Sequence, residues 1–183
     1  SDVVSVKISL MGDSHTGKTS FLKTYAGDGD ISDQVDKTLS VQGATISYSI
    51  SVVGGDVESS THQIPSACRD SMAMFFMFDL TSRRTMNSVI EWYKVARKWN
   101  PTAIAVLIGT KFDEFVDLPI DLQWAIASQA RSLAKAMNAT LFFSSSAYNI
   151  NVNKIFKFVT AKLFDLQWNL ERNLTIGEPI IDF

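Results

Sequence analysis

The stretch LMGDSHTGKTSF, residues 10–21, constrains the fold of this 183-residue chain more than any other. It contains the pattern Gly12-x-x-x-x-Gly17-Lys18-Thr19, directly after an alternating apolar run and before a segment with helical character. In such a loop, glycines let consecutive backbone N–H groups face a phosphate, and the start of the helix adds its positive end. We expect Lys18 to reach the outer phosphates and the Thr19 hydroxyl to bind Mg²⁺.

The whole phosphate-binding loop is predicted to run from the end of the first strand into the first turn of the helix. Its members are Asp13, Ser14, His15, Thr16, Gly17, Lys18, Thr19 and Ser20. We expect His15 to be a solvent-facing loop residue rather than a catalyst, because nothing in the pattern gives it a partner.

Short apolar runs alternate with helical periods along the rest of the chain, which favours an α/β fold with a mostly parallel sheet. The predicted strands cover residues 4–11, 38–41, 45–53, 72–80, 103–108 and 141–143. Helices are predicted over residues 17–25, 82–99, 122–137 and 152–166, and a loop over 54–66. Residues 1–168 are predicted to form one domain, with 169–183 as a C-terminal extension that packs on the domain or on a partner.

The charge balance narrows the class of partner. The formal net charge is −2 and the sequence pI is about 5.6, so no basic field favours a nucleic acid or an anionic membrane. The C-terminal sequence GEPIIDF carries no cysteine for prenylation, and we expect no lipid anchor. The single cysteine, Cys68, excludes an internal disulfide and is expected to be a small buried residue.

A second motif with chemical meaning follows the predicted strand at 103–108. It reads Gly109-Thr110-Lys111-Phe112-Asp113. The Asp113 carboxylate can accept hydrogen bonds from guanine N1–H and the exocyclic amine, which adenine does not offer in this pattern. We expect Lys111 to pack its stem beneath the base, and Thr110 to stand where a side-chain amide often joins this loop to the phosphate loop.

A serine-rich turn, Ser144-Ser145-Ser146-Ala147, follows the strand at 141–143. Its small side chains would let backbone N–H groups of Ser145, Ser146 and Ala147 approach a purine carbonyl. An ordinary serine-rich turn explains the same residues equally well.

Together these motifs, in this order, resemble a P-loop NTPase of the Ras superfamily of small GTPases. The stretches FMFDLTSRRTMNSV, EWYKVARKWN, IGTKFD and NINVNKIFKF resemble more closely the septum-promoting GTPases of septation-initiation and mitotic-exit signalling, especially their plant members. The resemblance implies a Ras-like G domain with a six-stranded, mostly parallel sheet and helices on both faces. It also implies a GTP/GDP switch with Mg²⁺, a protein kinase effector and a GTPase-activating complex. The implied location is cytoplasmic, with recruitment to microtubule-organising sites or the nucleus.

The chain differs from the family that it resembles at the residues that contact the γ-phosphate of GTP. The family carries a WDxGGQ-like sequence, whose Asp supports Mg²⁺ through water, where this chain has Val52-Val53-Gly54-Gly55-Asp56. Val52 cannot perform that role, and Asp56 replaces the glutamine that orients the attacking water. Gly55, through its backbone N–H, and Asp56 remain the candidate catalytic residues, and we expect weak intrinsic hydrolysis.

The first switch, which is the segment that carries a Mg²⁺-binding threonine in the resembled family, also differs from the family in its spacing. The Mg²⁺-binding threonine of the family would fall near Gly29, about nine residues before Thr38, and no threonine is there. Either the first switch is shortened, or the sequence lacks residues between about Gly29 and Gln34. These departures keep open the hypothesis of a pseudo-GTPase that signals through surface contacts. A P-loop kinase or ATPase is less favoured, because TKFD suits guanine.

Overall fold

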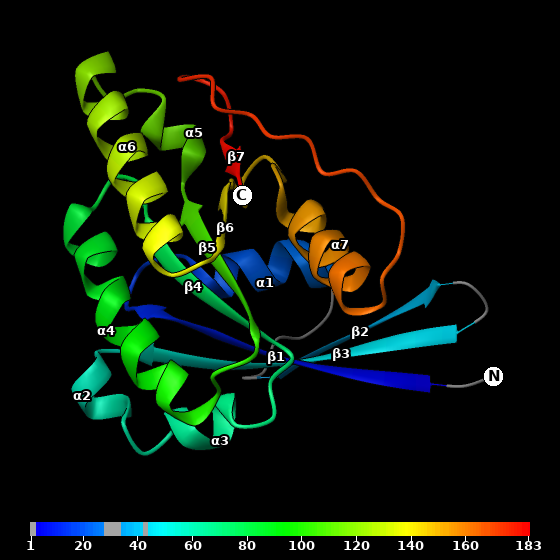
Figure 1. The fold of residues 1–183 in the computed structure, drawn as a ribbon. Coiled ribbons are helices and arrows are strands. Elements are labelled where there is room, and N and C mark those ends of the chain that lie inside the picture. The colour runs from blue at the N-terminus through cyan, green and yellow to red at the C-terminus, as the bar shows by residue number, and fades with distance from the viewer. Residues whose placement is uncertain (1–2, 28–33, 42–43) are drawn as a thin grey trace.

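The computed structural model describes residues 3–27, 34–41 and 44–183. Within that part of the chain the sheet has seven strands in the order β2-β3-β1-β4-β5-β6-β7 (Figure 1). The strands are β1 (Val3–Asp13), β2 (Gln34–Val41), β3 (Ala44–Gly55), β4 (Ala73–Asp79), β5 (Ile104–Thr110), β6 (Thr140–Phe143) and β7 (Ile181–Asp182). Both edge strands, β2 and β7, pair antiparallel and the inner pairs are parallel.

The six predicted strands and their mostly parallel pairing are confirmed, and the two-residue β7 adds a seventh. The turn predicted at Gln42-Gly43 lies outside the described residues. All seven residues of β4 are buried, as expected for a central strand covered on both faces. Met74 and Phe76 face one hydrophobic cluster and Phe75 and Met77 face the other, which is the two-residue period of a strand.

Helices cover both faces of the sheet (Figure 1). One cluster joins the sheet to α3 (Ile64–Cys68), α4 (Arg83–Trp99) and α6 (Ile120–Ala136). The other joins it to α1 (Lys18–Ala26) and α7 (Val152–Leu163). Two shorter helices are α2 (Val57–Ser60) and α5 (Phe112–Phe115). None of the described helices is both long and apolar enough to cross a bilayer.

The C-terminal residues run back along the domain. Ile181 of β7 pairs with Phe142 of β6, and the N–H of Phe143 donates to the carbonyl of Ile180 at 2.8 Å. Both isoleucines are buried, Ile180 against one face of the sheet and Ile181 against the other. The last strand is therefore fixed to the sheet by hydrogen bonds and by apolar packing.

Three local expectations are wrong. Residues 54–66 are not a single loop, because α2 lies within them and α3 begins there. The short helix α5 begins within the TKFD motif, where the sequence did not predict a helix. The apolar spacing within the predicted helix 122–137 places Trp124 among its inward-facing residues, but Trp124 is 57% exposed. Short helices are hard to see in sequence because one turn offers too few positions for a helical period.

Candidate functional site

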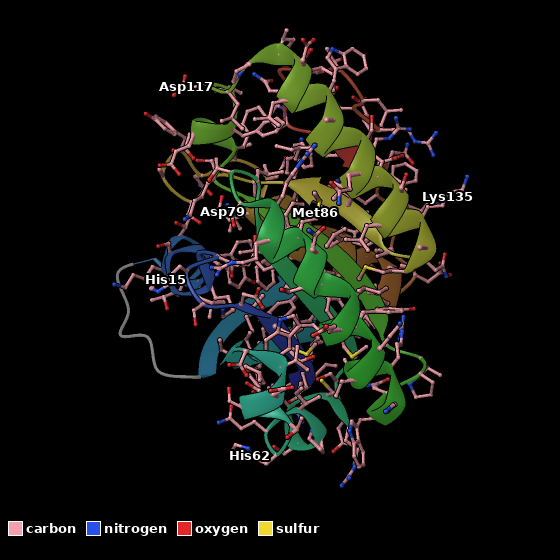
Figure 2. The ribbon with its side chains drawn as sticks, turned by 90° about the vertical axis from the view of Figure 1, so that its left-hand side faces the viewer. His15, His62, Asp79, Met86, Asp117 and Lys135 are labelled. Atoms are coloured by element: carbon pink, nitrogen blue, oxygen red, sulfur yellow. The ribbon has the colours of Figure 1, made fainter. Side chains whose placement is uncertain are left out.

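The candidate site lies where parallel strands β1, β4, β5 and β6 end, the usual ligand edge of such a sheet. The loop after β1 carries His15, β4 ends in Asp79, and the TKFD motif follows β5. Figure 2 shows His15 and Asp79 on the same side of the molecule, although 64 positions separate them in the sequence. The fold thus brings the separate predicted motifs to one edge.

The loop from Gly12 to Gly17 turns through backbone conformations that its residues must supply. Gly17, which caps α1, has φ 94°, and His15 has φ 65°. A Cβ at Gly12 would lie 2.5 Å from the carbonyl oxygen of Met77, so no side chain fits there. No side chain caps the first turn of α1, which leaves its N–H groups open to an anion. The exposed position of His15 confirms its prediction as a solvent-facing loop residue.

The Lys18 ammonium lies across this loop. Its Nζ donates to the carbonyl oxygens of Gly12 at 2.8 Å and Asp13 at 2.6 Å. Burial lowers the pKa of Lys18 from 10.5 to about 8, against the attraction of the Asp13 carboxylate. On the other side, a Cβ at Gly54 would lie 2.7 Å from Lys18 Cε, so β3 leaves just enough room for this side chain. A cation held in a loop of this shape suits a phosphate.

The TKFD loop is tied to the phosphate loop by two side chains. The Thr110 hydroxyl lies 2.5 Å from the carbonyl oxygen of Thr16 and 3.0 Å from that of Phe78. Lys111 Nζ lies 3.2 Å from the carbonyl oxygen of His15. The Thr110 hydroxyl thus occupies the position at which a side-chain amide often joins these two loops.

Lys111 also pairs with a residue that sequence analysis missed. Its Nζ lies 2.9 Å from Oδ2 of Asp79, a largely buried carboxylate that also accepts from the backbone and hydroxyl of Thr81. Asp79 ends the apolar run MAMFFMFDL, and a carboxylate closing a fully buried strand was the available signal. Its ion pair fixes Lys111 above the sheet edge.

Asp113 and the serine-rich turn meet as predicted. Ser145 Oγ donates to Asp113 Oδ1 at 2.8 Å, and Ser145 is fully buried. Thr24 of α1 donates to the carbonyl oxygen of Ser146 at 3.0 Å, while Ala147 is exposed in the turn. Within the described parts of the chain, Ser145 donates to Oδ1 of Asp113 only, so the other oxygen of this carboxylate can receive hydrogen bonds from a base.

Val52, Gly55 and Asp56 stand where the resembled family carries its γ-phosphate residues, and all three make contacts within the protein. Val52 packs partly buried against the cluster that includes Phe21 of α1. Asp56 is the N-cap of α2, where its Oδ1 accepts from the N–H of Ser59 at 2.7 Å. Hydrogen bonds from Ser59 lower the pKa of the Asp56 carboxyl, so it is an ionised acceptor. Gly55, at φ 104°, accepts from the Ser14 N–H at 3.2 Å.

A pocket of about 360 Å³ opens between the phosphate loop and the start of α2 and α4. Its lining residues are Asp13, Ser14, His15, Gly55, Asp56, Val57, Ser59, Arg84, Ser88 and Glu91. Arg84, in the first turn of α4, therefore faces the same space as Asp56. A larger pocket of about 580 Å³ lies between α6 and the C-terminal residues, away from the phosphate loop.

Trp92 is a second residue whose role the sequence did not reveal. Its helical spacing predicts an inward-facing core residue, and it is fully buried. Its indole Nε1 also donates to Asp13 Oδ1 at 2.9 Å and so joins α4 to the phosphate loop. The apolar pattern identifies the buried face, but it does not show which polar atom the indole N–H meets.

Thr19, which the sequence predicts as a Mg²⁺ ligand, is exposed in the first turn of α1. Among the described residues, no group of three or more His, Cys, Asp and Glu could hold a metal ion on its own. A hydroxyl beside an uncapped helix start fits a Mg²⁺ that takes its other ligands from phosphates and water.

Comparison with known proteins agrees with this arrangement. Residues 7–165 match the model of the Ras family. The chain is 41% identical to Septum-promoting GTP-binding protein 1 of Schizosaccharomyces pombe, over 98% of this chain and 94% of the relative. It is 28% identical to Ras-related protein SEC4 of Saccharomyces cerevisiae, over 94% of this chain and 80% of the relative. It is 25% identical to GTP-binding protein YPTM1 of Zea mays, over 86% and 77%.

The family match covers most of the chain, and the predicted resemblance is confirmed. Members of this family bind GTP and GDP with Mg²⁺ and hydrolyse GTP. The chain therefore belongs to the Ras family of small GTPases.

Proposed function

We propose that this GTPase is a guanine-nucleotide-dependent switch in the signalling that controls septation and cytokinesis. The observation that carries the proposal is the joined site: the phosphate loop, Asp113 and Ser145 converge on one sheet edge through direct hydrogen bonds. The role in cell division is supported by the 41% identity to a septum-promoting relative along almost the whole chain.

In this proposal the residues 13–20 hold the phosphates. The uncapped N–H groups of α1 and the Lys18 ammonium supply positive charge, and phosphate contact replaces the two carbonyl contacts that Lys18 now makes. Mg²⁺, when bound through Thr19, neutralises phosphate charge. These contacts would fix the phosphates without reading the base.

Base selection is assigned to the other two loops. Asp113 accepts the two guanine donors, and Ser145 keeps its carboxylate in place. Lys111 and Thr110 hold the base loop against the phosphate loop, and the turn of Ser145, Ser146 and Ala147 approaches the purine carbonyl. Discrimination against ATP follows, because adenine presents a different pattern of donors and acceptors.

Hydrolysis is proposed to be slow without a partner. Val52 offers no oxygen to support Mg²⁺, and the Asp56 carboxylate is engaged with Ser59 as a helix cap. An ionised carboxylate accepts but does not donate hydrogen bonds, so Asp56 cannot, as an amide could, both accept a hydrogen bond from the attacking water and donate one to the γ-phosphate. A GTPase-activating complex would supply what the chain lacks.

The resemblance further leads us to propose a protein kinase effector for the GTP state. It also leads us to propose a cytoplasmic protein that is recruited to microtubule-organising sites or the nucleus. The alternative is a pseudo-GTPase that binds a nucleotide and signals through surface contacts without turnover. Val52 is the observation that favours it, because it leaves the metal short of its usual support.

Single-turnover hydrolysis of GTP separates the two proposals. We expect slow turnover in the native protein and faster turnover in Val52→Asp combined with Asp56→Gln. Lys18→Ala serves as the inactive control. If the native protein shows no turnover above this control, with or without Mg²⁺, the pseudo-GTPase alternative is correct.

Complementation in S. pombe tests the role in cell division. Cells depleted of Septum-promoting GTP-binding protein 1 should form septa again when they express this chain, and should not when they express Lys18→Ala at equal abundance. Failure of the native chain to restore septa, while it binds GTP in vitro, would count against the septation role alone.

A further inference from the structure

An exposed apolar surface lies at the start of α6, outside the nucleotide site. Ile120 is 56% exposed, Trp124 57% and Val116 37%. Ile120 and Trp124 are four residues apart on one helix and therefore lie on the same side of it. The opposite side of α6 is used by the core, through Ile126, Ala127 and Ala130. We call Val116, Ile120 and Trp124 the α6 apolar patch.

Three carboxylates lie next to the residues of this patch in the sequence. Glu114, Asp117 and Asp121 are all exposed, and none of them belongs to an ion pair within the described parts of the chain. Figure 2 shows Asp117 projecting from the edge of the molecule at this end of α6. Asp121 lies in the first turn of α6, where it also complements the helix dipole. The patch therefore combines apolar anchors with unpaired negative charge.

We propose that the α6 apolar patch docks a partner protein through a basic amphipathic segment. Apolar side chains of that segment would cover Ile120 and Trp124, and its Lys or Arg residues would meet the three carboxylates. Large aromatic anchors ringed by polar groups are typical of residues that dominate protein interfaces. The same negative charge repels an anionic membrane or a nucleic acid, which leaves a protein as the occupant.

A second copy of the chain is a poorer match. The basic residues at the other end of α6 are Arg131 and Lys135, with Arg172 nearby. Arg131 and Arg172 are already paired with Asp182, at 2.8 Å and 3.2 Å. Both guanidinium groups are therefore held by one carboxylate of this chain, which offsets part of their charge, and charge complementarity favours a different protein whose basic side chains are unpaired.

The position of the patch predicts how docking depends on the nucleotide. Val116 follows α5, the short helix that carries Asp113, and its N–H donates to the carbonyl oxygen of Phe112 at 3.2 Å. The residues after β3 that would face a γ-phosphate lie in a different pocket, which α5 and α6 do not line. We therefore expect the partner to bind the GDP and GTP states equally, unlike an effector that reads the γ-phosphate.

Titration with designed peptides tests the proposal. The probe is a helical Leu/Lys peptide of about four turns, and its control replaces every Lys by Glu. The protein is ¹⁵N-labelled and loaded with GDP or GTPγS, and Trp124→Phe assigns the indole N–H signal of Trp124. We expect the Leu/Lys peptide to shift this signal in both states. We expect about tenfold weaker binding for Trp124→Ala and for the combined variant Glu114→Lys, Asp117→Lys and Asp121→Lys.

Trp99 provides an internal control. It is 42% exposed at the end of α4, distant from the start of α6 in Figure 1, and the Arg69 guanidinium lies 5.2 Å from its ring centre. Its indole signal should not move, and thermal melting should show that the charge-reversed variant is folded. The proposal is overturned if the Leu/Glu peptide binds equally well, if Trp99 shifts as much as Trp124, or if binding requires one nucleotide. A Trp124 shift that depends on protein concentration without peptide would assign the patch to a second copy instead.

Discussion

Replacing Asp113 by asparagine changes one donor–acceptor position at the proposed base site and almost nothing else. Ser145 Oγ lies 2.8 Å from Asp113 Oδ1, and asparagine retains an oxygen there, so the loop should keep its shape. The new amide group, however, presents N–H donors where guanine also presents a donor. The one oxygen of asparagine stays with Ser145, so the amide turns its donors toward the base and both acceptor contacts to guanine are lost.

The expected loss follows from the hydrogen bonds removed. A hydrogen bond to a charged group contributes about 1.5–3 kcal/mol, so losing two costs about 3–6 kcal/mol. That is about two to four orders of magnitude in Kd for GDP. Xanthosine diphosphate has a carbonyl where guanine has its exocyclic amine, so its affinity should rise in the same variant.

Displacement of a fluorescent GDP analogue by GDP or by xanthosine diphosphate measures the affinity of each variant for the two nucleotides. Asp117→Asn is the matched control, because it makes the same chemical change on an exposed carboxylate four positions along the chain. The control should keep its affinity for GDP. Unchanged GDP affinity in Asp113→Asn would refute the assignment of base selection to Asp113.

Three further predictions concern the phosphate loop. Trp92→Phe removes the 2.9 Å hydrogen bond to Asp13 Oδ1, and we expect the free energy of unfolding by urea to fall by about 1.5–3 kcal/mol. The control Trp99→Phe, at an exposed position, should lower it by less than about 0.5 kcal/mol. Equal losses in the two variants would contradict a stabilising role for the bond. Gly54→Ala places a Cβ 2.7 Å from Lys18 Cε. Because the end of a lysine side chain can move, the fold should persist, while the affinity for GTPγS measured by calorimetry should fall about tenfold. Unaltered affinity would show that Gly54 does not confine Lys18. In the nucleotide-free protein, Lys18 keeps its proton up to about pH 10.5 in the unfolded chain but only up to about pH 8 in the folded chain. The free energy of unfolding should therefore rise with pH between these values, relative to that of Lys18→Met. Urea denaturation at several pH values measures it, and the same pH dependence in both proteins would disprove the lowered pKa.

The mostly parallel sheet and the nucleotide edge could be predicted because their signals are local and repeated. The pattern GDSHTGKT sets strand, turn and helix at once, and the run MAMFFMFDL is long enough to indicate a strand buried on both faces. The family resemblance then implied a six-stranded sheet with helices on both faces, which periodicity alone does not provide. The convergence of Asp113 and Ser145 also followed from that resemblance.

The contacts that bind the loops to one another could not be predicted, because they join residues far apart in sequence. The pairing of Lys111 with Asp79 and the bond from Trp92 to Asp13 depend on how α4 and two strand ends are placed. The exposure of Trp124 was missed for a related reason, since a helical period admits a large residue at the border of its apolar face. Asp56 as the cap of α2 required the helix itself, which is one turn long.

Calorimetric titration with GDP, GTPγS and ATP, each with and without Mg²⁺, tests the central claim most directly. We expect GDP and GTPγS to bind more tightly with Mg²⁺ than without it, and ATP to bind little. Binding of GDP without any tightening of GTPγS by Mg²⁺ would contradict the switch, because Thr19 would then not hold a working metal. Equal affinity for ATP would contradict the guanine site itself.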